Sequence, residues 1–133
     1  MTITRLALDD IVAHAREADP QECCGVLLGV GDRITVAVRA RNVETSPTRF
    51  SLDPRDHIAA RKQARAAHQE VLGFYHSHPR SAPQPSSSDI AEWSYPEALS
   101  VIVGREHERL LARAFTIGAD AATEVSLEVE CLE

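Results

Sequence analysis

The chain has 133 residues, close to the commonest size of one domain, so we expect a single domain over residues 1–133. Hydrophobic residues make up 44% of it and charged residues 26%, a balance typical of folded proteins and not of disordered ones. The formal net charge of -6 disfavours a nucleic-acid partner, because phosphate binding depends on clustered lysine and arginine.

The sequence also bears on location and on disulfides. No apolar run approaches the roughly 20 residues that cross a bilayer, and residues 1–10 lack the apolar centre of a signal peptide. We therefore expect a cytoplasmic protein with no membrane partner. The cysteines Cys23, Cys24 and Cys131 are few and odd in number, and adjacent cysteines rarely bond to each other, so no disulfide framework is expected.

The first half of the chain predicts a helix followed by a hairpin. Apolar residues recur at helical spacing from Leu8 to Ala15, and Asp19-Pro20 ends that segment. The apolar run 24–29 and the alternating segment 34–38 lie on either side of the turn signal Gly31-Asp32. These two segments therefore predict an antiparallel pair of strands.

The rest of the chain predicts two more helices and four strands. After a loop from Asn42 to Arg49, Asp53-Pro54 supplies an N-cap and a first-turn proline for a helix that runs to Ala67. A short helix is expected over 86–93. The predicted strands are residues 71–75, 98–103, 110–117 and 125–131. This order predicts a mixed α/β fold with a central, mostly antiparallel sheet flanked by helices.

Three side chains near the end of the 71–75 strand form a candidate metal site. His76 and His78 are two residues apart, and alternate side chains of a strand project to the same side. Asp89 follows in the first turn of the next predicted helix. Two imidazoles and one carboxylate are typical of catalytic zinc, with the fourth position left for water, so Zn²⁺ is the expected cofactor.

Two further residues complete the chemistry of amide hydrolysis. Zinc lowers the pKa of water towards roughly 7, and a nearby carboxylate can take the proton. Glu22 precedes a strand of buried type, where low polarity raises a carboxyl pKa, so we expect it to be the base. Ser86 shares a helix face with Asp89, and its hydroxyl can donate to the oxyanion of the attacked carbonyl.

Each assignment has a simpler alternative. Glu22 could be an exposed loop residue after Pro20, and Ser86 could only cap its helix, which is worth about 1 kcal/mol. Cys24 is more typical of a small buried residue than of a ligand. The stretch Asn42 to Asp53, including Phe50, is our expectation for part of a substrate groove.

The motif His76-Ser77-His78-Pro79, six residues, then Ser86-Ser87-Ser88-Asp89 resembles the JAMM signature of the MPN-plus zinc metallopeptidases. The segment 22–29, Glu-Cys-Cys-Gly-Val-Leu-Leu-Gly, resembles the segment that supplies the catalytic glutamate of that family. The resemblance covers nearly the whole chain and is nearest to the prokaryotic branch. It implies a cytidine-deaminase-like MPN/JAB fold, with zinc on His76, His78 and Asp89.

The resemblance also implies a substrate class. Members of the family cleave peptide or isopeptide bonds after the glycine tail of ubiquitin-like proteins, and the prokaryotic branch includes hydrolases of sulfur-carrier adducts that release cysteine. We therefore expect a ubiquitin-like sulfur-carrier protein, or its adduct, as the partner. The few residues between Asp89 and Leu99 leave no room for the long insertion with which eukaryotic deubiquitinases hold ubiquitin.

Two other functions share the outline of this family. One is a metal-free MPN scaffold that acts as an interaction module, but such proteins lose the ligands that are present here. The other is a RadC-type protein associated with DNA, which carries a similar histidine and aspartate pattern. Those chains are longer and have an added helical part, whereas this chain is short and acidic.

Overall fold

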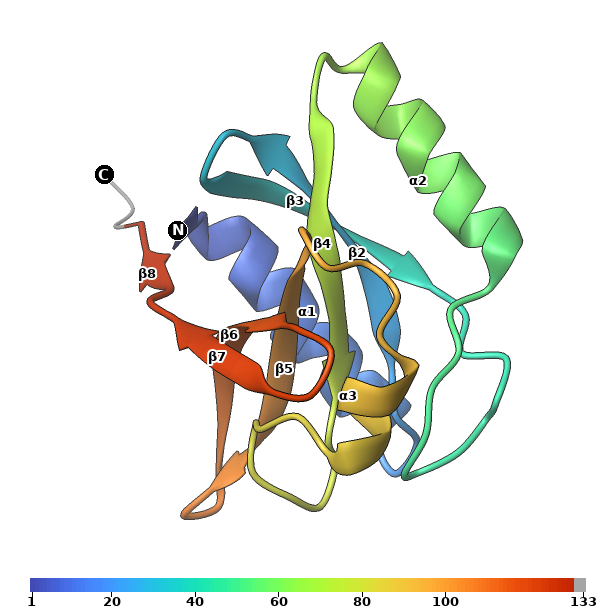
Figure 1. Ribbon diagram of the computed structural model, residues 1–133, viewed down its shortest axis with the longest axis vertical. Coiled ribbons are helices and arrows are strands. Elements are labelled where there is room, and N and C mark those ends of the chain that lie inside the picture. Colours follow the sequence, from blue (N-terminus) through green and yellow to red (C-terminus); the bar gives the residue numbers. More distant parts are fainter. Residues whose placement is uncertain (131–133) are drawn as a thin grey trace.

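The computed structural model describes residues 1–130, which form an eight-stranded sheet and three helices (Figure 1). The strands follow one another across the sheet in the order β7-β6-β5-β4-β2-β3-β1-β8. Their bounds are β1 (Thr2–Ile3), β2 (Cys24–Val30), β3 (Arg33–Ala40), β4 (Glu70–Ser77), β5 (Leu99–Glu106), β6 (Arg109–Ile117), β7 (Ala122–Val125) and β8 (Glu128–Val129). The helices are α1 (Arg5–Ala18), α2 (Pro54–Ala66) and α3 (Ser87–Glu92).

The pairing of the strands is mixed. Antiparallel pairs join β2 to β3, β2 to β4, β5 to β6 and β6 to β7. Parallel pairs join β4 to β5, and β1 to both β3 and β8. The prediction of a mixed α/β fold with a mostly antiparallel sheet between helices is confirmed.

The alternation of side chains along β4 divides the core between the two faces of the sheet. Tyr75 belongs to the cluster that packs against α1. Phe74 belongs to the cluster that packs against α2, together with Ala60 and Ala64 of that helix. Because His76 is two residues beyond Phe74, it projects from the α2 face, and α3 lies near the same end of β4 (Figure 1).

The three helices begin at side-chain caps. Thr4 accepts a hydrogen bond from the Ala7 amide at 3.2 Å, so α1 starts earlier than its apolar spacing predicts. Asp53 caps α2 through the Arg55 amide at 2.8 Å, and Pro54 is the first helical residue, as predicted. Within residues 1–130, none of the helices has the length and apolar character needed to cross a membrane.

The prediction of one strand over 125–131 is wrong. The alternation of Val125, Leu127 and Val129 is real, because all three pack against the α1-side core. However, β7 pairs with β6 at one edge of the sheet, and β8 pairs with β1 at the other. Side-chain alternation reports which face a residue occupies and carries no information about the neighbouring strand. Cys131 lies outside the described residues.

Candidate active site

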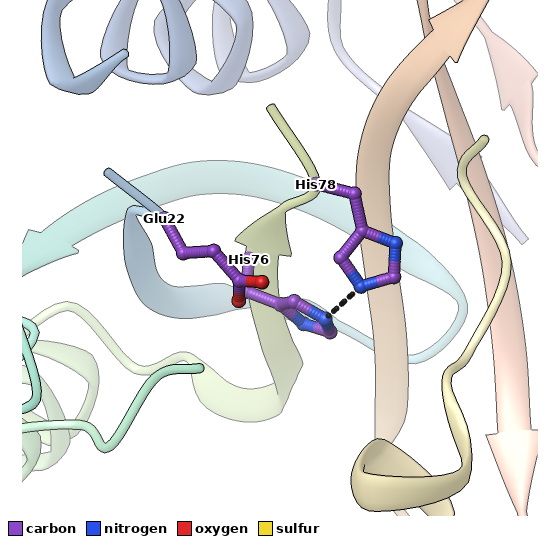
Figure 2. A group of neighbouring side chains, drawn as sticks. All are labelled: Glu22, His76 and His78. Carbon is purple, nitrogen blue, oxygen red and sulfur yellow. Dashed lines mark hydrogen bonds between the residues drawn. The ribbon is translucent and has the colours of Figure 1, made fainter. Parts of the chain in front are cut away.

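Antiparallel pairing between β2 and β4 brings Glu22 to the histidines. Cys24 of β2 is opposite His76 of β4 in the register of the pair. The pairing continues beyond β2, because the Cys23 amide donates to the Ser77 hydroxyl at 2.9 Å and the Ser77 amide donates to the Cys23 carbonyl at 3.1 Å. Glu22, the next residue outward, therefore lies beside the end of β4 that carries His76 and His78 (Figure 2).

The ring nitrogens and carboxylate oxygens converge tightly. His76 Nε2 and His78 Nε2 are 3.2 Å apart, and Asp89 Oδ2 is 3.2 Å from the first and 3.1 Å from the second. Ligands at about 2.0–2.1 Å around a tetrahedral zinc are separated from one another by about 3.3 Å. One ligand atom each of Glu22, His76 and His78 also lies within 4.8 Å of the others. The triangle has the size that a zinc ion requires.

The hydrogen bonds of His78 favour a cation in this triangle. Its Nδ1 lies 3.1 Å from the Ala82 carbonyl, which can only accept, so Nδ1 carries the hydrogen. In the neutral ring, Nε2 then presents a lone pair to the Asp89 carboxylate, which also presents lone pairs. A cation or an added proton relieves this contact. A backbone acceptor on the far nitrogen is the usual support of a metal-binding histidine.

The protonation tendencies of the two histidines differ. Burial lowers the pKa of His76, and its contact with Asp89 offsets this only in part. Burial would also lower the pKa of His78, but its bonds to Asp89 and Ala82 outweigh that effect, so the pKa is raised. Partial burial would raise the pKa of Asp89, yet its bonds to both histidines hold the pKa of the carboxyl well below its usual range. A carboxylate that stays ionised is suited to binding a cation.

Ser86 fixes the orientation of Asp89 through a reciprocal cap at the start of α3. The Ser86 hydroxyl accepts from the Asp89 amide at 3.0 Å, and the Ser86 amide donates to Asp89 Oδ2 at 2.8 Å. The predicted role of Ser86 as the N-cap of this helix is therefore confirmed. Its hydroxyl hydrogen is not used in this cap, so the expected donation to a substrate oxyanion is compatible with it.

Glu22 is buried, contrary to the alternative of an exposed loop residue, with 5% of its surface accessible. Burial raises its pKa from 4.5 to about 7, an effect that His78 opposes and Asp89 reinforces. Its Oε1 is buried and has no hydrogen-bond partner among residues 1–130. An unpaired buried carboxylate oxygen is costly and uncommon, and a water held by a metal ion would supply the missing donor. The residues present therefore fit a catalytic zinc site.

A cavity of about 460 Å³ opens beside His76 and Asp89. Aromatic residues are only 5% of the chain, yet four of them line this cavity, namely Phe50, Phe74, Trp93 and Tyr95. Phe50 stacks on His76, with ring centroids 4.3 Å apart and an interplanar angle of 19°. The sequence predicts Phe50 as part of a substrate groove. It gave no signal for Phe74 or Tyr95, because the folded chain alone brings these rings together.

Three comparisons relate this geometry to known proteins. A family model described as "Prokaryotic homologs of the JAB domain" matches residues 4–118. A desampylase of Haloferax volcanii is 36% identical over 98% of this chain and 100% of that protein. A CysO-cysteine peptidase of Mycobacterium tuberculosis is 34% identical over 90% of this chain and 84% of that protein. The crystal structure of a JAB1/MPN domain protein from Archaeoglobus fulgidus has a TM-score of 0.60 at 21% identity, covers 98% of this chain and 96% of its own, and shows a likeness of fold.

Proposed function

Since the chain belongs to the family of prokaryotic JAB-domain homologues, we propose that it is a zinc-dependent hydrolase of ubiquitin-like carrier proteins. The chain is an enzyme of the peptidase type, as its named relatives are. The bond cleaved is the amide or isopeptide bond after the glycine tail of the carrier. The observation that carries the proposal is the buried carboxylate of Glu22, unpaired at Oε1 among the described residues, beside the two histidines.

The proposed metal ligands are His76 Nε2, His78 Nε2 and Asp89 Oδ2. Zinc bound there supplies an acidified water and polarises the carbonyl under attack. Glu22 Oε1 then accepts a proton from the attacking water and delivers it to the leaving nitrogen. A carboxyl with a pKa of about 7 exchanges a proton readily in both directions near neutral pH.

The proposed role of Ser86 is to donate its hydroxyl hydrogen to the carbonyl oxygen as negative charge develops. The cap with Asp89 holds the serine in one place before the substrate arrives. Asp89 and Ser86 are therefore fixed by the same two hydrogen bonds, so the metal ligand and the oxyanion donor move as one unit.

The proposed reaction allows two leaving groups, free cysteine or the lysine of a modified protein. One relative is named as a desampylase and the other as a peptidase of a cysteine adduct, at 36% and 34% identity. The two identities are too close to favour either leaving group. A chain that releases cysteine would cleave a carrier-cysteine adduct and leave a carrier-lysine isopeptide intact. A chain that removes a protein modifier would cleave the isopeptide.

The metal-free scaffold is the non-enzymatic alternative. A scaffold has no use for a buried, unpaired carboxylate, because burying that group destabilises the fold unless a ligand compensates. Glu22 instead lies together with His76 and His78, and Asp89 contacts both histidines. This arrangement supports the enzyme over the scaffold. The expected lack of a nucleic-acid partner and the cytoplasmic location stay predictions.

A direct test uses the zinc-loaded protein and two carrier substrates, one ending in a diglycine-cysteine adduct and one in a diglycine-lysine isopeptide. We expect cleavage after the second glycine of at least one substrate, measured by the intact mass of the products. A chelator should abolish cleavage, and added zinc should restore it. Purified protein that binds no zinc and cleaves neither substrate would contradict the proposal and favour the metal-free scaffold.

A further inference from the structure

The side-chain amide of Asn42 bonds both to the segment that precedes β2 and to the residues that follow Asn42 in the chain. Its Nδ2 donates to the Glu22 carbonyl at 3.1 Å and to the Arg49 carbonyl at 3.0 Å. Its Oδ1 accepts from the Glu44 amide at 3.0 Å and from the Ser51 amide at 2.9 Å. With four bonds, the amide has two donors and two acceptor positions filled.

Three of these bonds lie within residues 42–52, here called the Asn42 loop. The loop is closed at its ends by an antiparallel bridge between Asn42 and Leu52 and by the Val43 amide, which donates to the Ser51 carbonyl at 2.9 Å. The loop has no helix or regular strand of its own. Asn42 therefore makes many of the hydrogen bonds that fix the shape of the loop.

Both main-chain polar groups of Glu22 bond to this same loop. The Glu22 amide donates to the Ser46 carbonyl at 2.8 Å, and the Glu22 carbonyl accepts from Asn42. The position of the Glu22 backbone is thus set by the Asn42 loop on one side and by the β2–β4 pairing on the other. A movement of the loop would move the carboxylate relative to the histidines.

The far end of the loop reaches the metal site from another direction. Arg49 and Ser51, whose backbone groups bond to Asn42, flank Phe50. The Phe50 ring stacks on His76 and lines the cavity beside it. One amide therefore links the backbone of the base to the aromatic wall that covers a proposed metal ligand.

We propose that Asn42 is a positioning residue for hydrolysis, which sets Glu22 and Phe50 at fixed places relative to the metal site. The expected effect on turnover rests on the proposed function. The expected effect on the positions of Glu22 and Phe50 rests on geometry alone. Asn42 does not itself take part in the chemistry, because its four bonds all go to backbone atoms. Displacing a reacting group by about 1 Å can lower turnover by about a hundredfold.

The variant Asn42→Asp separates positioning from the general shape of the loop. Aspartate keeps the acceptor for the Glu44 and Ser51 amides, but it places an oxygen against the carbonyls of Glu22 and Arg49, where the donor had been. Thr48→Ala is the matched control. It removes a side-chain contact to Ser46 in the same loop and touches neither Asn42 nor the cavity.

For zinc-loaded Asn42→Asp we expect kcat to fall by between about tenfold and a hundredfold, with KM changed by less than about threefold and zinc content unchanged. Thr48→Ala should match the original chain in all three quantities. A residue that only stabilised the fold would lower the folded fraction and leave the kcat of the folded protein unaltered. An unchanged kcat in folded, zinc-loaded Asn42→Asp would overturn the proposal.

Amide hydrogen exchange supplies a readout that does not depend on activity. In the original chain the amides of Glu22, Glu44 and Ser51 should be protected. In Asn42→Asp, the aspartate oxygen repels the Glu22 carbonyl and so displaces the Glu22 backbone from the Ser46 carbonyl that its amide bonds to. The Glu22 amide should therefore lose protection more than the Ser51 amide, which still donates to the side chain at position 42. Equal protection of Glu22 in both proteins would refute the positioning role even if no substrate were cleaved. An inactive original chain with these exchange changes would instead count against the proposed function alone.

Discussion

His14 is a single residue whose protonation makes the stability of this fold depend on pH. Its Nδ1 lies 2.7 Å from the Tyr75 hydroxyl, on the α1 side of the sheet. Burial lowers the pKa of His14 from 6.5 to about 4; Arg39 lowers it further, and Glu17 opposes this. The same burial raises the pKa of the Tyr75 hydroxyl well above its ordinary value. At neutral pH both partners are therefore uncharged.

This pair predicts a loss of stability in acid. Between pH 6.5 and about 4 the unfolded chain binds a proton at His14 and the folded chain does not, so the free energy of unfolding falls as the pH falls. We expect His14→Asn to lack this component, which solvent screening of the half-buried ring limits to about 1–2 kcal/mol. Urea unfolding of both proteins at pH 7 and pH 4.5 measures it. An identical loss of stability in the two proteins would contradict the role of His14.

Single residues were predictable where chemistry restricts the choice. His76, His78 and Asp89 could be proposed as ligands from the sequence because their spacing on a strand and a helix start brings them to one side. Asn42 and Phe50 differ in this respect, since asparagine and phenylalanine occur in many loops without any role. Asn42 contacts the Glu22 carbonyl and Phe50 contacts the His76 ring, and these partners lie in distant parts of the sequence.

At the scale of elements, β5 holds the loop that supports His78. The Arg105 amide donates to the Ser81 carbonyl at 2.7 Å, and the His78 amide donates to the Val103 carbonyl at 2.7 Å. Gly104 lies between these two strand residues. A Cβ added there would lie 2.6 Å from the Ser81 oxygen and from the Ala82 carbonyl carbon, so the strand and loop pack too closely for a side chain.

We therefore expect Gly104→Ala to displace the loop and disturb the Ala82 carbonyl that accepts from His78. Overpacking of this kind costs about 1–3 kcal/mol of stability, and loss of a supporting bond weakens metal affinity by about 10- to 100-fold. Thermal unfolding and zinc titration measure the two effects. Gly118→Ala is the control, because its nearest neighbour would be at 3.6 Å. Equal zinc affinity in both variants would argue against the support by β5.

Elements with strong local signals were predictable, and elements defined by their partners were not. The Asp53-Pro54 start of α2 and the hairpin of β2 and β3 follow from capping and turn chemistry. β1 has two residues, too few to show an alternation, and it is a strand only because β3 and β8 lie on either side of it. The division of residues 122–129 between two edges of the sheet could not be predicted either, because it depends on the neighbouring strands and not on a local pattern.

At the scale of the whole molecule, the order of the strands in the sheet brings the residues of the site together. The order β5-β4-β2 places the support of His78 on one side of β4 and Glu22 on the other. The helices add Asp89 and Ser86 through α3, near the same end of β4 (Figure 1). The sequence indicated Glu22 as a base through its place before a strand of buried type and through resemblance. It did not show how Glu22 reaches the histidines, because the pairing of β2 with β4 is a long-range contact that no local pattern specifies.

The most direct measurement of the central claim is the turnover of Glu22→Gln on a cleavable carrier substrate, with zinc content determined on the same sample. The glutamine keeps the size of the side chain and removes only the ability to take a proton. We predict one zinc per chain and a turnover reduced by about 10²- to 10⁴-fold, the usual contribution of a general base. Full turnover by zinc-loaded Glu22→Gln would contradict the account, because another group would then have to take the proton.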